Sequence, residues 1–320
     1  MAVHALRKIW FGIPFLYVLL RRFETALFDR LDRQGLARLM KQHVLSASEG
    51  HALWLSKPHA MGRPALMGIL NVTPDSFSDG GLFQSPETAL AHAREMLADG
   101  ADIVDIGAES TRPGFRSVPA DEEWARLEPV LGRLVPEGVP LSVDTTKSVV
   151  ARKALQRGVR LINDVWGFHS DPDMPFVIAD SGASAVIMHN RYEVDDQLDL
   201  LADWRRFFDH SLELAEKAGL ARKRLILDPG VGFGKTQDQN VQAIGSLGVL
   251  KTEYELPILL GLSRKSLFGY LLGRPIEDRL AGTLAANLVG ADLGADILRV
   301  HDIREHSDAL SIRRVLKEAV

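Results

Sequence analysis

Polar and ionisable side chains recur at one kind of position in this sequence, directly after short apolar runs. One such residue is unremarkable, because Asp and Asn also cap the helix that follows a strand. Helix capping is a less satisfactory explanation when polar residues follow eight apolar runs of one chain. They supply amides, carboxylates, hydroxyls and cations, and they are Asn71, Glu109 with Thr111 and Arg112, Asp144, Asn163, His189, Asp228, Ser263 with Arg264 and Lys265, and Arg299 with His301.

The cations of this set favour an anionic substrate. Arg299 and His301 are two residues apart at the end of a strand-like run, so their side chains point to the same side. The planar guanidinium fork suits phosphate oxygens, and an imidazole can add a hydrogen bond. The alternative interpretation is an ion pair with Asp302 or Glu305.

Two polar loops follow the first two apolar runs. Residues 71–81 (NVTPDSFSDGG) contain a pair of glycines, and residues 109–114 (ESTRPG) end on Pro-Gly, which favours a tight turn. Loops of this kind can close over a ligand. Each loop by itself is also compatible with an ordinary surface loop.

Residues 228–236 (DPGVGFGKT) resemble a nucleotide P-loop only in part. The pattern GxxxxGK[ST] would require glycine where Pro229 stands, and the segment follows the sixth apolar run instead of the first. The three glycines are also spaced wrongly for GxGxxG. ATP and NAD binding are therefore disfavoured, and the segment is expected to be a flexible glycine loop that carries Phe233.

The elements that must position these residues alternate along the chain from residue 64 onward. Eight strand-like runs occupy residues 65–71, 102–107, 140–144, 160–165, 184–189, 224–228, 257–263 and 295–301, with helical patterns after them. Continuously apolar strands are typical of a parallel sheet covered on both faces. The pattern predicts an α/β fold, a (β/α)8 TIM barrel over residues 64–320, whose strand ends meet at one mouth. A doubly wound open sheet is the alternative.

The first 63 residues are expected to be an N-terminal extension. Residues 9–20 (IWFGIPFLYVLL) form an apolar run that is shorter than the roughly 20 residues of a membrane span and lacks a signal-peptide cleavage site after it. A loosely attached tail is the favoured interpretation, and an interfacial helix is the alternative. Residues 42–63 could form a hairpin that closes the bottom of the barrel.

Composition excludes several classes of protein. The formal net charge is −4, with 38 basic and 42 acidic residues, so no overall positive field favours nucleic-acid binding. The chain has no cysteine, which excludes disulfides, thiolate metal ligands and a cysteine nucleophile. We expect a cytoplasmic protein without a stable membrane span.

Seven motifs follow one another in order from about residue 64 to the C-terminus. They are MGILNVTPDSFSDGG (67–81), ESTRPG (109–114), SVDT (142–145), INDV (162–165), LDPGVGFGKT (227–236), GLSRKS (261–266) and RVHDIRE (299–305). Together they resemble the dihydropteroate synthase family of folate biosynthesis. The resemblance implies a (β/α)8 barrel, usually a homodimer, that joins 7,8-dihydropterin-6-ylmethyl diphosphate to 4-aminobenzoate and releases diphosphate, with Mg²⁺ as cofactor.

The resemblance also assigns roles to matching positions. Asp144, Asn163, Asp228 and Lys265 match the pterin site, and Thr111, Arg112, Pro113, Phe233 and Ser263 match the 4-aminobenzoate side. Asn71, Arg299 and His301 match the diphosphate site, where Asn71 also helps to bind Mg²⁺. The implied catalytic residues are Asp144, Lys265 and Arg299.

One segment departs from the family pattern. Residues 188–200 (MHNRYEVDDQLDL) replace a more usual methionine-containing stretch, and Asn190 stands where that stretch has a methionine beside the pterin. Two alternatives to an active synthase would differ from it in these motifs. A methyltetrahydrofolate-dependent methyltransferase would lack the Thr-Arg-Pro-Gly loop and the Ser-Arg-Lys-Ser motif, and a non-catalytic homologue would have lost Lys265, Arg299 or the Asn71 loop.

Overall fold

The structure is a computed structural model that describes residues 55, 58–72, 86–109 and 118–319. By its contacts the chain divides into Met1–Ser46 and Ala47–Val320, and all described residues belong to the second unit. The predictions for the apolar run at residues 9–20 therefore lie outside the described residues. The extension boundary at residue 63 stays a prediction.

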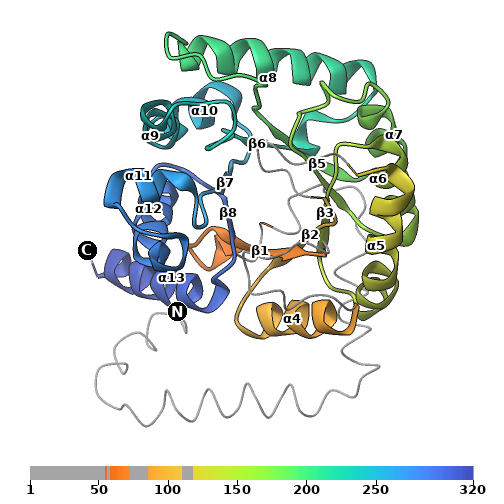
Figure 1. Cartoon of the computed structure of the whole chain (residues 1–320), viewed down its shortest axis with the longest axis horizontal. Helices are drawn as coiled ribbons and strands as arrows, with labels where there is room; N and C mark the ends of the chain where they lie inside the picture. The colour runs from red at the N-terminus through yellow and green to blue at the C-terminus, as the bar shows by residue number, and fades with distance from the viewer. Residues whose placement is uncertain (1–54, 56–57, 73–85, 110–117, 320) are drawn as a thin grey trace, which may run out of the picture. The chain divides into compact units, whose positions relative to one another are not determined.

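Eight parallel strands form the centre of the described unit (Figure 1). They are β1 (Ala65–Asn71), β2 (Ile103–Gly107), β3 (Leu141–Asp144), β4 (Leu161–Asp164), β5 (Ser184–Met188), β6 (Leu225–Asp228), β7 (Leu259–Gly261) and β8 (Ile297–Val300). Neighbours run in the order β6-β5-β4-β3-β2-β1-β8-β7. A parallel bridge between Leu227 and Ile258 joins the two ends of this order, so the sheet closes into a barrel. The predicted barrel is confirmed, and the open-sheet alternative is wrong.

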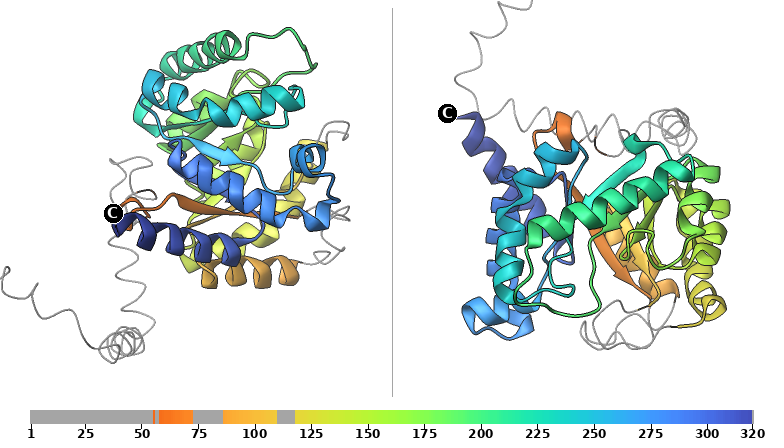
Figure 2. Two further views of the ribbon diagram at one scale, coloured as in Figure 1. Left: turned by 90° about the vertical axis from the view of Figure 1, so that its left-hand side faces the viewer. Right: turned by 90° about the horizontal axis from the view of Figure 1, so that it is seen from above.

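Helices follow the strands and surround them (Figures 1 and 2). They are α4 (Pro86–Ala98), α5 (Ala120–Leu134), α6 (Ser148–Arg157), α7 (Met174–Ser181), α8 (Leu200–Lys217), α9 (Gln237–Gly245), α10 (Leu247–Tyr254), α11 (Ser266–Leu272), α12 (Leu280–Asp292) and α13 (Ile303–Glu318). The last unit lies beside the first because β8 pairs with β1. The ring of helices explains why the strands are apolar on their outer face as well as their inner one.

The two faces of the strands fill two different cores. Outward residues pack against the helices in one large cluster, to which Leu66, Leu70 and Val104 belong. Inward residues fill the lower barrel in a second cluster: Leu55, Ala65, Met67, Ile103, Leu161, Val186, Ile226, Leu259 and Ile297. Complete burial of one such leucine or isoleucine contributes about 1.5–3 kcal/mol. Apolar side chains therefore fill the interior at the amino ends of the strands, which leaves the carboxyl ends as the place for a polar site.

The segment before β1 differs from its prediction. Leu55 and residues 58–60 are helical, so the described residues of the 42–63 stretch do not form the expected strands. Leu55 is only 3 % exposed and packs among the inward residues of the barrel. A buried leucine therefore covers the apolar lower interior, which is the task the hairpin was expected to perform.

Candidate active site

The polar site grows out of the same inward rows of side chains that form the lower core. Side chains alternate along a strand, so every second residue faces the barrel interior. On β2 this inward row is Ile103, Asp105 and Gly107, and on β8 it begins Ile297 and Arg299. On β6 Ile226 is followed by Asp228 in the same way. Each row thus begins with an apolar residue and continues with a charged one, which places the predicted residues at one mouth.

Arg299 forms the centre of the site. Its Nε donates to Asp105 at 2.7 Å, and its Nη2 donates to Asp144 at 3.0 Å. The Asp105 side chain is 0 % exposed and that of Asp144 is 6 % exposed, whereas the Arg299 side chain is 21 % exposed. Burial raises the pKa of Asp144 to about 8, with the Arg299 charge acting against the shift and Asp105 adding to it. The guanidinium thus holds two adjacent carboxylates together while part of it faces the mouth.

The alternative ion pair predicted for Arg299 is wrong. Asp302 instead accepts from Arg264, and Arg299 pairs with carboxylates from two other strands. Sequence reasoning also missed Asp105, which lies inside the apolar run of β2 between Val104 and Ile106. Its second role is to accept from the Asn163 amide at 3.1 Å. A lone acid within a buried strand was the signal that could have revealed it.

Asp228 and Lys265 form the next part of the mouth, beyond Gly261, where an added methyl group would lie 4.0 Å from both Arg299 Cβ and an Asp228 oxygen. One Asp228 oxygen accepts from the Gly230 amide at 2.8 Å, and burial raises the pKa of this carboxyl while the Lys265 charge opposes the shift. The Lys265 ammonium donates to the Val231 carbonyl and lies 4.6 Å from the centre of the Phe233 ring. Burial lowers the pKa of Lys265 to about 8, with the Asp228 charge opposing the shift. The cation therefore lies between a carboxylate and an aromatic face.

The turn after β7 carries both Ser263 and Lys265, and several hydrogen bonds fix its conformation. Ser263 accepts from the His301 backbone amide at 3.2 Å, and its hydroxyl lies 2.8 Å from His301 Nδ1. Arg264 between them has φ of 55°, a left-handed conformation that is uncommon for a residue with a side chain. Its amide donates to Thr283 at 3.2 Å, and Arg279 donates to its carbonyl at 3.1 Å. These contacts from the start of α12 fix the turn.

Comparison with known proteins agrees with this geometry. The family model described as "Pterin binding enzyme" matches residues 67–301. A dihydropteroate synthase of Bacillus subtilis is 44% identical over 270 residues, which are 83% of this chain and 93% of the relative. This chain belongs to the dihydropteroate synthases of the pterin-binding family. It is accordingly a transferase, and the methyltransferase alternative is wrong.

Solved structures of dihydropteroate synthases share the fold. One from Clostridium difficile, in the presence of pteroic acid, is 45% identical with a TM-score of 0.75, and the match covers 79% of this chain and 97% of that one. One from Xanthomonas albilineans with 4-aminobenzoic acid is 44% identical with a TM-score of 0.76, covering 80% of this chain and 94% of that one. Both matches leave about a fifth of this chain uncovered.

Asn71 ends β1 in register with Gly107 of β2, which is itself in register with Asp144 of β3. A methyl group added at Gly107 would lie 3.8 Å from the Asn71 amide oxygen and 3.9 Å from an Asp144 oxygen, so these two atoms flank one point. The other Asp144 oxygen is buried without a hydrogen-bond partner. Mg²⁺ prefers such oxygen ligands and completes its shell with water and phosphate. The residues fit a Mg²⁺ site, although the described residues contain no cluster of three or more His, Cys, Asp or Glu that could hold a metal.

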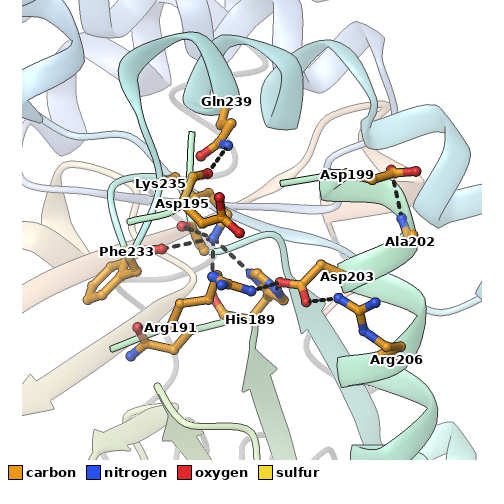
Figure 3. Close-up of polar contacts among 12 residues, drawn as sticks. His189, Arg191, Asp195, Asp199, Ala202, Asp203, Arg206, Phe233, Lys235 and Gln239 are labelled. Atoms are coloured by element: carbon orange, nitrogen blue, oxygen red, sulfur yellow. Dashed lines mark hydrogen bonds and ion pairs between the residues drawn. The ribbon is translucent and has the colours of Figure 1, made fainter. Parts of the chain in front are cut away.

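The segment that departs from the dihydropteroate synthase pattern has a defined structural role. The Asn190 amide donates to the Val165 carbonyl at 2.9 Å, and its oxygen accepts from the Arg191 amide at 2.8 Å. Asn190 thereby joins the loop after β5 to the loop after β4. Farther along, Gln239 of α9 donates to the Asp195 carbonyl at 2.6 Å (Figure 3). The altered segment is therefore held by its own contacts to neighbouring loops.

Two polar residues that the dihydropteroate synthase resemblance did not assign lie beneath the glycine loop. His189 is 0 % exposed, and Lys235 is 6 % exposed (Figure 3). Their nearest side-chain atoms, His189 Nδ1 and Lys235 Nζ, are 2.8 Å apart. In the sequence His189 follows a predicted strand, and Lys235 stands in the segment that only partly matches a P-loop. The repeated glycines before Lys235 were the signal that this loop needs an internal support.

Three predicted residues of the dihydropteroate synthase site, Thr111, Arg112 and Pro113, lie outside the described residues, as does most of the 71–81 loop. The structure describes the residues on either side of the loop that carries Thr111, Arg112 and Pro113. Glu109 accepts from the Val118 amide at 2.9 Å, and its other oxygen accepts from Lys147. Lys147 also donates to the buried Glu123 at 2.7 Å. The Glu109 carboxylate therefore brings together the residues on either side of this loop.

Proposed function

We propose that the barrel mouth joins 7,8-dihydropterin-6-ylmethyl diphosphate to 4-aminobenzoate to give 7,8-dihydropteroate and diphosphate. The observation that carries this proposal is the position of the Lys265 ammonium, which is attracted by the Asp228 carboxylate and lies 4.6 Å from the Phe233 ring centre. A cation between a carboxylate on one side and an aromatic ring on the other can contact two different substrates at once, which suits a reaction that joins two ring-containing molecules. The similar structures with pteroic acid and with 4-aminobenzoic acid support the same assignment.

The pterin is proposed to bind to Asp144, Asn163, Asp228 and Lys265. The pterin ring presents an amino group and a ring N–H side by side, and a carboxylate can accept from both at once. Asp228 is buried and has one oxygen engaged by Gly230, which leaves its other oxygen for the ligand. Asn163 would read another edge of the ring with its amide.

The second substrate is proposed to lie against Phe233 and Ser263, together with Thr111, Arg112 and Pro113 of the loop after β2. Ser263 would approach the carboxylate of 4-aminobenzoate. On the other side, Asn71, Arg299 and His301 would bind the diphosphate, and Asn71 would hold Mg²⁺. A bound Mg²⁺ would neutralise part of the negative charge that develops on the leaving diphosphate.

The proposed reaction breaks the C–O bond between the pterin methylene and diphosphate and forms a C–N bond from the arylamine. The electron pair of the broken bond leaves with diphosphate, where Arg299 and His301 would stabilise the developing charge. The pterin ring shares the positive charge left on the methylene, and Asp144 would stabilise it, because a nearby positive charge favours the ionised form of this carboxyl group. The amine is neutral at pH 7 and releases its proton after attack, so the reaction requires no strong base.

A coupled assay of 4-aminobenzoate incorporation with purified protein tests this function. We expect dihydropteroate to form only when both substrates are present. A protein that binds both ligands but forms no product would instead be the non-catalytic homologue. The retention of Asn71, Lys265 and Arg299 argues against that alternative.

The two substrates are expected to bind in a coupled manner. This follows if diphosphate and the loops at residues 71–81 and 109–116 together complete the second subsite. Calorimetry should then show that 4-aminobenzoate binds weakly to the free protein and more tightly after diphosphate, Mg²⁺ and a pterin are added. Equal affinity in both conditions would contradict the coupling. Sulfonamides resemble 4-aminobenzoate in shape and charge, so they should compete with it and not with the pterin.

The pH dependence of the reaction should reveal Lys265. Because its pKa is lowered to about 8, the ammonium is present at pH 7 and is lost as the pH rises through 8. We expect kcat/KM for 4-aminobenzoate to fall above pH 8 with the slope of one proton. From about pH 8 to the usual lysine pKa of 10.5, the unfolded chain binds this proton and the folded chain does not, so the contribution to stability rises. A rate that stays constant to pH 9.5 would show that the charge is not required.

We further propose a cytoplasmic homodimer. No described helix has the length and hydropathy needed to cross a bilayer. Large apolar side chains that are more than half exposed gather on consecutive C-terminal helices, namely Tyr270, Leu271 and Leu272 of α11, Val289 of α12, and Ile312, Val315 and Leu316 of α13. Exposed apolar groups of this kind often mark an interface between subunits. Sedimentation of the purified protein gives the oligomeric state directly.

A further inference from the structure

A buried ammonium group supports the glycine loop that follows β6. The Nζ atom of Lys235 lies 2.8 Å from His189 Nδ1, 2.8 Å from the Gly230 carbonyl oxygen and 3.0 Å from the Phe233 carbonyl oxygen (Figure 3). An ammonium has three N–H donors, and here each can meet one acceptor, which favours the charged form although burial lowers the pKa of Lys235 to about 7. The Lys235 side chain is therefore arranged as an internal support and not as a group awaiting a substrate.

His189 is held in the form that this arrangement needs. Its Nδ1 can accept from Lys235 only if the ring proton is on Nε2, and Nε2 lies 3.0 Å from an Asp203 oxygen. Burial lowers the pKa of His189 to about 4, which keeps the ring neutral at pH 7. Asp203 in turn accepts from Arg191 at 2.7 Å and from Arg206 at 2.6 Å. A chain of hydrogen bonds thus connects the loop to the first turns of α8.

The loop itself needs support from side chains because of its backbone. Gly230, Gly232 and Gly234 all have positive φ, at 68°, 85° and 57°. Glycine adopts these angles without steric cost, but it also loses more conformational freedom than other residues when it is fixed. A loop with three such residues in five positions must be held by contacts from outside, and Lys235 contacts two of its carbonyls.

Lys235 acts on the same loop as Lys265. The Lys265 ammonium donates to the Val231 carbonyl, between the two carbonyls that Lys235 holds. A methyl group added at Gly232 would lie 3.2 Å from the Lys265 stem, which shows how closely that stem packs on the loop. The position of the loop therefore sets the position of both Lys265 and the Phe233 ring.

We propose that Lys235 is a positioning residue for the 4-aminobenzoate half of the reaction. By fixing residues 229–234 from beneath, it holds Phe233 and the Val231 carbonyl where they can orient Lys265 toward the second substrate. This inference rests on the proposed function. The pterin side shares Lys265 and the Gly230 amide with this loop, but Asp144, Asn163 and Asp228 are anchored on β3, β4 and β6, so the pterin side depends less on Lys235.

The test compares Lys235→Met with the unmodified protein. Methionine keeps the unbranched stem and removes all three N–H donors. We expect KM for 4-aminobenzoate to rise at least tenfold, while KM for the pterin diphosphate changes less than threefold. Calorimetry of 4-aminobenzoate binding to the complex with a pterin and diphosphate should show the same loss of affinity. An equal change for both substrates, or a lower melting temperature with no change in either KM, would overturn the proposal.

A matched control and a milder variant complete the test. Lys251→Met removes an ammonium that lies 2.5 Å from Asp296, just before β8 at the opposite end of the barrel, and should leave both KM values unchanged. Asp203→Asn weakens the contact between residue 203 and His189, the histidine that Lys235 contacts. This change should raise KM for 4-aminobenzoate by a smaller factor. If Lys235→Met does not fold, Asp203→Asn decides, and an unchanged KM there would overturn the proposal. Failure of the unmodified protein to form product would instead contradict the proposed function.

Discussion

Replacing Asp228 with asparagine is expected to abolish pterin binding, with at least a hundredfold loss of affinity, while the barrel stays folded. The Gly230 amide donates to one Asp228 oxygen, so the asparagine carbonyl will take that position. The amide NH2 must then occupy the place of the other oxygen, where it presents donors to the donors of the pterin. Calorimetry with a pterin ligand measures the loss, and near-native affinity would contradict the assignment of Asp228.

A buried aspartate on a nearby strand supplies the control. Asp164 ends β4, and its two oxygens accept from the backbone amides of Trp166 and Phe168 at 2.9 Å and 2.8 Å. Asp164→Asn replaces one of these acceptors with a donor and should lower the melting temperature. It should leave pterin affinity within a few-fold of the original, because both oxygens serve the fold.

Replacing Arg299 with methionine is expected to damage both stability and activity. The change leaves Asp105 and Asp144 buried side by side without their shared cation. Removing one partner of a buried ion pair costs about 3–5 kcal/mol. We expect the rate of product formation to fall at least a hundredfold, because diphosphate also loses its proposed cation. Thermal denaturation and the coupled assay measure the two effects.

The pH dependence of this destabilisation identifies its cause. Without Arg299, the pKa of Asp144 should rise further above its value in the unfolded chain. The folded variant then keeps this proton above pH 8, where the unmodified protein has already lost it, so the loss of stability caused by the substitution should grow as the pH rises above 8. Arg299→Lys keeps the charge but not the two-point contact and should be intermediate. The control Arg63→Met removes a pair with Asp102, at 2.6 Å and 3.0 Å, near the start of β2 and should lower stability without changing pterin affinity.

The barrel could be predicted because its strands are short, apolar on both faces and regularly separated by helical patterns. The prediction for β1 is correct at both ends, whereas β7 covers only Leu259–Gly261 of a predicted 257–263. Periodicity cannot show where pairing ends when the apolar run continues beyond it. The helical residues before β1 were missed because Leu55 is buried by contact with distant strands, which no local pattern reveals.

The site was predictable where a polar residue follows a strand, and less so where it lies within one. Asp144, Asn163 and Asp228 were found at strand ends, but Asp105 lies earlier on its strand and was missed. Its importance depends on Arg299, which is 194 positions away in sequence and 2.7 Å away in space. Lys235 was missed for a related reason, since its acceptors are backbone carbonyls and a histidine from another strand.

The closure between β6 and β7 has a consequence for how the protein responds to its ligands. Leu227 and Ile258 form the bridge there, and the Leu227 amide donates to the Pro257 carbonyl at 2.9 Å, whereas other neighbouring strands share registers of three to five residues. Because the pairing is sparse, we expect this seam to open with a smaller free energy than the rest of the sheet. Asp228 ends one of its strands, and Ser263 and Lys265 follow the other. A ligand that contacts residues after both β6 and β7 therefore stabilises the pairing between these two strands. Saturating substrate should slow amide hydrogen exchange at this seam more than elsewhere in the sheet.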